Sequence, residues 1–87
     1  MKFPLGQIVV TANALSKLDM YDISIALSRH KSGDWGDLCD EDKALNDRAV
    51  QYGDRIFSAY HAKDGTKFWV ITEADRSYTT VLLPEDY

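Results

Sequence analysis

The sequence is poor in the residues that build cross-linked or metal-bound scaffolds. It contains a single cysteine, Cys39, so the chain cannot form an internal disulfide. Without a Cys-x-x-Cys pair it also lacks the usual ligand spacing of a structural zinc site. These absences predict a protein of a reducing compartment, which we expect to be cytoplasmic and to need neither a metal nor a cofactor.

Long apolar runs and a strong excess of one charge are also missing. No window approaches the roughly 20 apolar residues of a transmembrane helix, so no membrane span is expected. The opening stretch breaks its apolar run at Pro4 and Gly6, which is untypical of a signal peptide. Ten basic and fourteen acidic side chains give a net charge of -4, which makes nucleic acid an unexpected partner.

What the sequence does contain is a change from helical to extended patterns along residues 1–87, which we expect to form a single compact domain. Residues 6–12 (GQIVVTA) are apolar and β-branched and predict a short first strand. The candidate N-caps of the helices that follow are Asn13, Asp22 and Asp40. The spacing of apolar residues assigns the buried faces of the second and third helices to Ile23, Ala26, Leu27 and His30, and to Leu45, Ala49 and Tyr52.

The second half of the chain has the composition of a β-meander. RIFSAYHA (55–62) and KFWVITE (67–73) flank the Asp64–Gly65 pair, which favours a tight hairpin. YTTVLL (78–83) supplies a last strand that Pro84 ends. Because the second of these strands is apolar on both faces, we expect it to be central or covered on both sides. The predicted fold is α+β: a short N-terminal strand, two to three helices, then a three-stranded antiparallel meander, with the helices packed on the sheet.

Residues with chemical potential concentrate in the segment HKSGDWGDLCDED (30–42). One interpretation is architectural: His30 is a packed, hydrogen-bonded histidine, Trp35 is a buried anchor, and Asp34 and Asp37 are turn residues. The alternative takes His30, Asp34, Asp37 and Cys39 as metal ligands or acid-base groups. Because this set offers two imidazole or thiolate ligands at most, it falls short of a zinc site. Asp34 and Asp37 are an alternative oxygen-rich magnesium site, but they lack a recognisable loop signature, and no metal site is predicted.

A second polar cluster, ITEADRSYTT (71–80), lies before the last strand. Glu73, Asp75 and Arg76 are interpreted as members of a salt-bridged turn. Alternatively, Arg76 and Arg55 form an anion site, because guanidinium groups match the geometry of phosphate and carboxylate. That alternative requires the two guanidinium groups to converge in space.

A set of long strings carries a resemblance that covers essentially the whole chain: MKFPLGQIVVT, HKSGDWGDL, EDKALN, GDRIFSAY and WVITEADRSYTTVLLPEDY. The chain resembles a family of short bacterial proteins found on plasmids and other mobile elements, whose members are labelled "plasmid-related protein" or type I restriction subunit M. The resemblance implies a mobile-element accessory protein but brings no mechanism with it. The restriction label finds no support, because the sequence has no methyltransferase-sized domain and no Gly-rich cofactor loop.

Two functional classes follow. In the first, the protein is a non-enzymatic binding module, such as a counter-defence factor of anti-restriction or anti-CRISPR type, that docks on a host or defence protein. Its candidate binding residues are Asp34, Trp35, Asp37, Glu73, Asp75 and Arg76. The acidic segments DWGDLCDED and PEDY then either present the binding surface or serve as a solvated face. A homodimer paired through the edge of the first or last strand stays open.

In the second class, the protein is a small ribonuclease, similar in outline to barnase-like and toxin ribonucleases. Acid-base catalysis and cationic stabilisation of the phosphorane would then come from His30, Arg55, Arg76 and either Thr79 or Thr80. This class predicts that His30, Arg55 and Arg76 line one pocket. The net charge of -4 argues against it, because an RNA substrate would be repelled.

Overall fold

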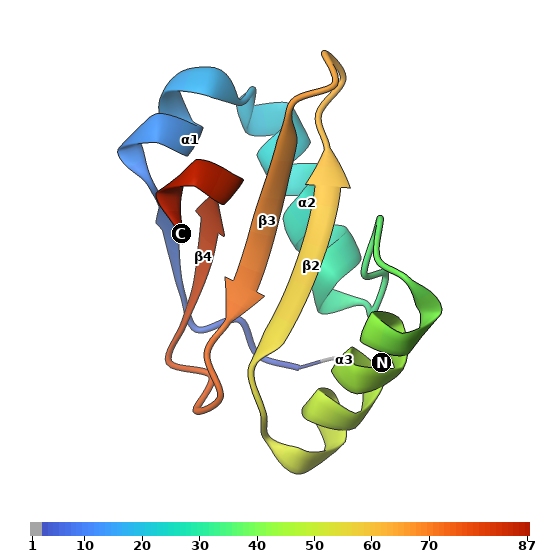
Figure 1. The fold of residues 1–87 in the computed structure, drawn as a ribbon. Helices are drawn as coiled ribbons and strands as arrows, with labels where there is room; N and C mark the ends of the chain where they lie inside the picture. The colour runs from blue at the N-terminus through green and yellow to red at the C-terminus, as the bar shows by residue number, and fades with distance from the viewer. Residues whose placement is uncertain (1–2) are drawn as a thin grey trace.

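The computed structural model describes residues 3–87, so the first two positions of the expected domain, Met1 and Lys2, lie outside the described residues. Over this range the chain forms one four-stranded sheet and three α-helices (Figure 1). In chain order the elements are β1 (Gln7–Val10), α1 (Ala12–Lys17), α2 (Met20–Lys31), α3 (Asp40–Tyr52), β2 (Ile56–His61), β3 (Lys67–Thr72), β4 (Tyr78–Leu82) and a 3₁₀ turn, η1 (Pro84–Asp86).

The sheet is mixed, and its strand order is β1-β4-β3-β2. β2, β3 and β4 are antiparallel neighbours, and the hairpin between β2 and β3 contains Asp64 and Gly65 as expected. β1 pairs with β4 in parallel, with Gln7 opposite Tyr78. The α+β class is confirmed, but the expected three-stranded meander is corrected to one part of a four-stranded mixed sheet. Local patterns do not reveal the parallel pair, because its two strands come from opposite ends of the chain.

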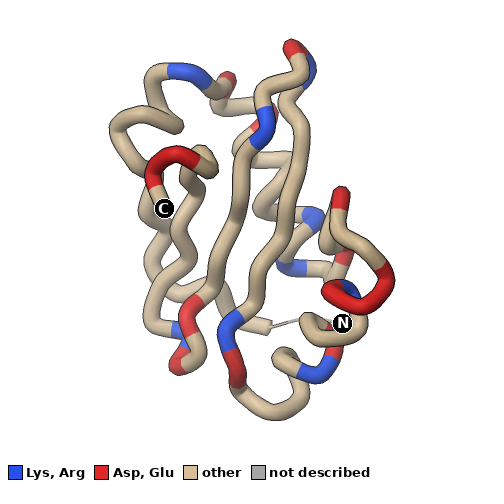
Figure 2. Tube along the Cα trace, viewed as in Figure 1, with Lys and Arg blue, Asp and Glu red and all other residues tan. Residues whose placement is uncertain are grey.

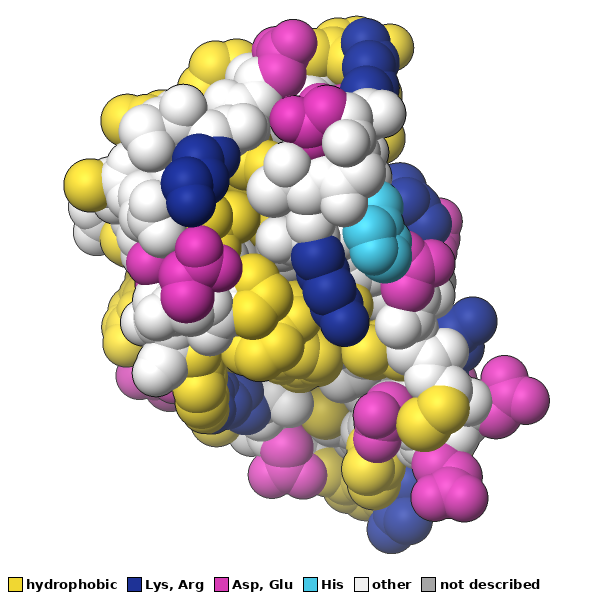
Figure 3. All heavy atoms as spheres, turned by 45° about the horizontal axis from the view of Figure 1, so that its top comes forward, with side chains coloured by type: hydrophobic (Ala, Val, Ile, Leu, Met, Phe, Trp, Pro, Cys, Tyr) yellow, Lys and Arg dark blue, Asp and Glu magenta, His cyan; other side chains and the backbone are white. Residues whose placement is uncertain are grey.

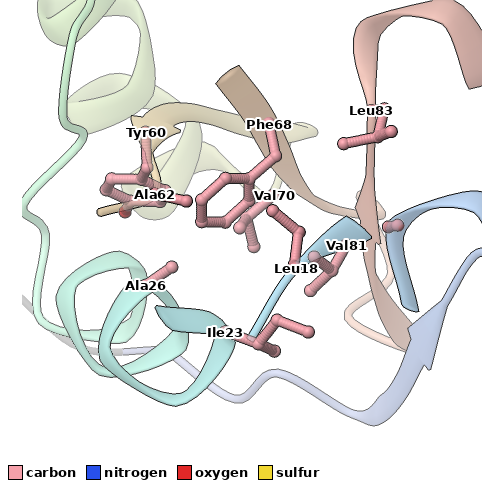
Figure 4. Packing of buried hydrophobic residues seen from close by; sticks show 10 residues of the cluster. Leu18, Ile23, Ala26, Tyr60, Ala62, Phe68, Val70, Val81 and Leu83 are labelled. Atoms are coloured by element: carbon pink, nitrogen blue, oxygen red, sulfur yellow. The ribbon is translucent and has the colours of Figure 1, made fainter. Parts of the chain in front are cut away.

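One face of the sheet carries the main hydrophobic core. α2 runs behind β2 and β3 in Figure 1, and contacts link α1 to β4, α2 to β3 and α3 to β2. The side chains that meet between helices and sheet are all apolar or aromatic (Figure 4): Ala14, Leu18, Ile23, Ala26, Tyr60, Ala62, Phe68, Val70, Val81 and Leu83. In the described residues no α-helix lies on the opposite face, where the 3₁₀ turn η1 contacts β3; we call this the open face.

The helix caps differ from the expected ones. α1 is capped by Thr11, whose side chain accepts from the Ala14 amide, and α2 by Asp19, which accepts from the Tyr21 amide. At α3 the cap position is Cys39, without a side-chain bond, and Asp40 is the first helical residue. Asn13 and Asp22 therefore lie inside their helices. The sequence patterns predicted that each helix begins later than it does. Several residues that favour the N-cap position lie close together, and tertiary packing decides which of them caps the helix.

The buried face of α3 is also rotated from the expected one. Leu45 and Tyr52 are 59% and 68% exposed, whereas Ala49 is buried as expected, together with Asn46. The Asn46 amide donates to the Phe57 carbonyl (2.5 Å) and accepts from the Phe57 amide (3.1 Å). The polar side chain of Asn46 therefore faces inward, because it satisfies the backbone N–H and C=O groups of Phe57 on β2.

The outer edge of β2 is covered by the chain itself. Residues 35–37 run beside it: the Ala59 amide donates to the Trp35 carbonyl (3.2 Å), and the Asp37 amide donates to the Ala59 carbonyl (2.7 Å). Gly36 lies between these bonds with a φ of +76°, and a Cβ there would be 2.0 Å from the Ala59 carbonyl oxygen. Only glycine permits this close approach, which removes one exposed sheet edge.

Substituting Gly36 tests that approach. We expect Gly36→Ala to lower the free energy of unfolding by about 3 kcal/mol or more, since it adds a clash with a backbone oxygen to the cost of a positive φ. Gly53→Ala is the matched control, because Gly53 has a φ of +77° and no atom within 4 Å of the added Cβ. It should lose only about 1 to 2 kcal/mol. Urea unfolding measures the free energy of unfolding of both variants. Equal losses of stability would mean that residues 35–37 are not held against β2.

Candidate functional site

Behind the sheet, a chain of buried polar side chains joins α2 to the strands. His30 is 0% exposed, and its ring nitrogens meet Ser58 Oγ on β2 and Thr72 Oγ1 on β3. Thr72 Oγ1 lies 2.7 Å from Thr79 Oγ1 on β4, and Thr79 donates to the Leu5 carbonyl at 2.6 Å. One row of hydrogen bonds therefore ties α2 to β2, β3, β4 and the segment before β1. His30 is the packed, hydrogen-bonded histidine of the architectural interpretation.

The Leu5 carbonyl at the end of this row determines which threonine hydroxyl donates and which accepts. A carbonyl oxygen only accepts, so the single hydroxyl proton of Thr79 is used on Leu5, and Thr72 must donate to Thr79. Thr72 then accepts from Nε2 of His30, so the row requires a proton on Nε2. In a neutral ring Nδ1 accepts from the Ser58 hydroxyl.

The surroundings of His30 agree with a neutral ring. Burial lowers the pKa of His30 from 6.5 to about 4, and the positive charge of Arg76 contributes to the same shift. A ring with no exposed surface and both nitrogens in hydrogen bonds does not reach a substrate phosphate. Thr79 is used in the same row, and Thr80 lies on the open face, opposite Ile71 on β3. The proposed catalytic set is therefore divided between the two faces of the sheet.

Arg76 has a structural environment of its own. Its Nη1 donates to the carbonyls of Asp54 (2.7 Å), Glu73 (3.1 Å) and Ala74 (3.2 Å), and its Nη2 donates to the Ala49 carbonyl (2.9 Å). The Ala49 carbonyl belongs to the last turn of α3, where the helix dipole favours a cation. Arg76 therefore fastens the end of α3 to the turn between β3 and β4.

Arg55 is engaged elsewhere. Its Nη1 donates to the Tyr87 hydroxyl (2.8 Å), and its Nε lies 3.7 Å from the Glu73 carboxylate. The anion site expected from Arg55 and Arg76 is not formed, because the donors of Arg76 are used by backbone carbonyls. A shallow depression on the same turn is lined by Glu73, Ala74, Asp75, Ser77 and Tyr78, whose carboxylates would repel an anion.

The expected binding residues of the 30–42 segment also hold the fold together. Trp35 is buried, its ring lies edge-on to His30 (5.8 Å), and its Nε1 donates to the Asp47 carboxylate (2.9 Å). Asp34 pairs with Arg29, whose Nε lies 2.7 Å from the carboxylate. The architectural interpretation describes both residues, and the buried Trp35 offers no surface to a partner.

Asp37, the third candidate of this segment, is exposed and lies 2.5 Å from Nδ1 of His61. This contact links the covering segment to the end of β2. Among residues 3–87 there is no group of three or more His, Cys, Asp or Glu side chains placed to hold a metal ion.

The open face carries a feature that the sequence analysis missed. The Phe57 and Trp69 rings are 4.9 Å apart and edge-to-face, and the Trp69 and Tyr87 rings follow at 5.8 Å. We call Phe57, Trp69 and Tyr87 the aromatic row. Phe57 and Trp69 are half-buried, and Tyr87 is 70% exposed. The strand that is apolar on both faces, β3, is central in the sheet, as expected. Its apolar residues on the open face were the signal for the aromatic row.

A groove adjoins the aromatic row where α3 meets β2. It has a volume of about 270 Å³ and is lined by Leu38, Asp42, Leu45, Asn46, Arg55 and Phe57. Phe57 therefore belongs both to the row and to the groove. We call the aromatic row and this groove together the strip, which runs from β3 across β2 to α3.

Charged side chains border the aromatic row, and Asp42 and Arg55 line the adjoining groove. The middle of each strand carries no Lys, Arg, Asp or Glu (Figure 2). In the space-filling view hydrophobic side chains gather at the centre of the face, with basic, acidic and His side chains around them (Figure 3). The rim has both signs, since Lys67 begins β3, Arg55 precedes β2 and pairs with Glu73, and Glu85 lies in η1. The strip thus has the arrangement of an interface: an apolar centre and a polar rim.

No family model, no curated protein and no solved structure matches the chain. In the described part of the chain, no helix has the length and apolar content needed to cross a membrane.

The buried row makes stability depend on pH. The native His30 has a pKa of about 4 and the unfolded one a pKa of 6.5, so the unfolded chain takes up the proton first. His30 therefore stabilises the fold fully above pH 6.5, and this contribution of about 3 kcal/mol falls away as the pH drops toward about 4. Urea unfolding at a series of pH values measures how the free energy of unfolding depends on pH. His61→Gln, which changes an exposed histidine, should keep this pH dependence, whereas His30→Gln should remove it.

The ¹⁵N shifts of the His30 ring give a second readout, which does not depend on a stable variant. They should report a neutral ring protonated on Nε2 in wild-type protein down to about pH 4. A ring that titrates near 6.5, or one that carries its proton on Nδ1, would contradict the assigned row.

Proposed function

We propose that the protein is a non-enzymatic binding module that docks a protein partner on the open face of its sheet. The aromatic row is the observation that supports this function. Single exposed apolar residues are common on protein surfaces, but three aromatic rings in consecutive contact beside a groove are typical of the centre of an interface. The strip replaces Asp34 and Trp35 as the proposed point of contact.

The charges favour a protein over a nucleic acid as the partner. A platform that stacks single-stranded nucleic acid combines aromatic rings with a positively charged groove. Here Arg55 is paired with Glu73, the adjoining groove contains Asp42, and the whole chain has a net charge of -4. A partner surface with apolar side chains at its centre and charges of both signs at its rim fits this strip better than a polyanion does.

A ribonuclease activity would need a different arrangement of its acid-base group. His30 would have to leave a site with no exposed surface and give up both of its ring hydrogen bonds. Replacing it should therefore lower thermal stability and remove no RNA cleavage activity.

The resemblance to plasmid-borne proteins supports a role as an accessory factor of mobile elements, with a host or defence protein as its partner in the cytoplasm. Counter-defence by direct docking is consistent with a chain of 87 residues, because it requires a surface and no catalytic lobe.

The strip is tested by comparing two exposed tyrosines. We expect Tyr87→Ala to weaken partner binding about tenfold, since it removes the most exposed ring of the aromatic row. Tyr52→Ala is the matched control, because Tyr52 is 68% exposed, against 70% for Tyr87, and lies on α3 outside the strip. Immobilised wild type and both variants are exposed to bacterial lysate, and captured proteins are quantified by mass spectrometry.

The proposal requires a protein that wild type and Tyr52→Ala retain and that Tyr87→Ala loses. Equal capture by all three proteins would contradict docking on the open face. An RNA cleavage assay runs in parallel, and cleavage that disappears in a folded His30 variant would favour the ribonuclease instead.

A further inference from the structure

The two edges of the sheet are treated differently. The edge of β2 is covered by residues 35–37, whereas nothing in the described residues pairs with the outer edge of β1. β1 is also exposed, since Ile8 and Val9 are 41% and 40% accessible on opposite faces of the strand. Edge strands are usually protected by charges, prolines or bulges. β1 has the sequence QIVV, and residues 3–16 contain no charged side chain.

The backbone of β1 presents unpaired groups on this edge. The Gln7 amide donates to the Ser77 carbonyl and the Thr11 amide to the Val81 carbonyl, so the odd-numbered positions face β4. Because backbone groups alternate along a strand, the N–H and C=O groups of Ile8 and Val10 face outward. These are the donors and acceptors that a further strand would use.

That edge is complementary to itself. In an antiparallel pair centred on Val9, Ile8 of one copy lies opposite Val10 of the other, and each such pair exchanges two hydrogen bonds through its outward groups. Val9 then lies beside Val9 of the second copy, and Gln7 lies opposite Thr11. Every cross-strand pair is apolar or neutral, so no like charges meet.

We propose that β1 pairs with β1 of a second copy of this chain, antiparallel and with the two-fold axis beside Val9. The two four-stranded sheets then form one continuous sheet, and the open faces of both copies lie on the same side. This dimer rests on the edge alone and does not depend on the aromatic row or its partner.

Charge at the axis tests both the dimer and its register. We expect wild-type protein to show a concentration-dependent dimer in sedimentation equilibrium. Val9→Lys and Val9→Glu should each be monomeric at concentrations where wild type is dimeric, because each brings two like charges side by side. An equal mixture of the two variants should recover the dimer, since opposite charges then meet. Ile25→Lys is the control, because it adds the same charge to an apolar position on α2 that is 41% exposed, close to the 40% of Val9, and lies outside the strip.

Amide exchange on the wild type gives a second test that needs no variant. Exchange at Ile8 and Val10 should slow as the protein concentration rises, whereas exchange at Val9, whose N–H faces β4, should not change.

A wild type that stays monomeric at every soluble concentration would overturn the proposal. So would folded Val9→Lys protein that still dimerises, or loss of the dimer in Ile25→Lys. Failure of the mixed variants to associate would overturn the register centred on Val9. Loss of partner capture by Tyr87→Ala leaves the dimer unaffected, so the two proposals fail independently.

Discussion

The buried row of hydrogen bonds through His30 is the constraint on which the rest of the structure depends. It lies between α2 and the sheet, where an unsatisfied polar group would be costly, and each of its members has a partner. The His30 ring also contacts Phe3 (5.3 Å) and Trp35 (5.8 Å), so the same side chain positions the N-terminal segment and the loop after α2. Because Trp35 precedes Gly36, this packing also places the segment that covers the edge of β2.

The placement of polar groups explains which surfaces stay accessible. The acidic side chains of the loop after α2 are used in pairs, Asp34 with Arg29 and Asp37 with His61, and Arg76 is used at the end of α3. Structural roles thus account for the residues that attracted attention in the sequence. The open face and the edge of β1 carry few polar side chains and take little part in such pairs. Their surfaces therefore remain accessible to another molecule.

Features of the fold that depend on residues close in sequence were predictable, whereas features that depend on contacts between distant residues were not. The strands and the hairpin at Asp64–Gly65 depend on neighbouring residues, so their patterns were readable. The structural roles of His30 and Trp35 were also readable, because a histidine on an apolar helix face packs inward with that face, and flanking glycines let a tryptophan ring turn into the core. The parallel pairing of β1 with β4 and the inward turn of Asn46 depend on contacts between distant parts of the chain. The aromatic row was missed for the same reason, since Tyr87 meets Trp69 only after η1 folds back over β3.

The two tryptophans occupy opposite environments. Trp35 lies in the interior beside His30, and Trp69 lies half-exposed on the open face between Phe57 and Tyr87. A ligand that arrives on the sheet therefore changes the fluorescence of Trp69 and leaves that of Trp35 unchanged, whereas unfolding changes both. The protein carries intrinsic optical probes that distinguish the two events and needs no added label.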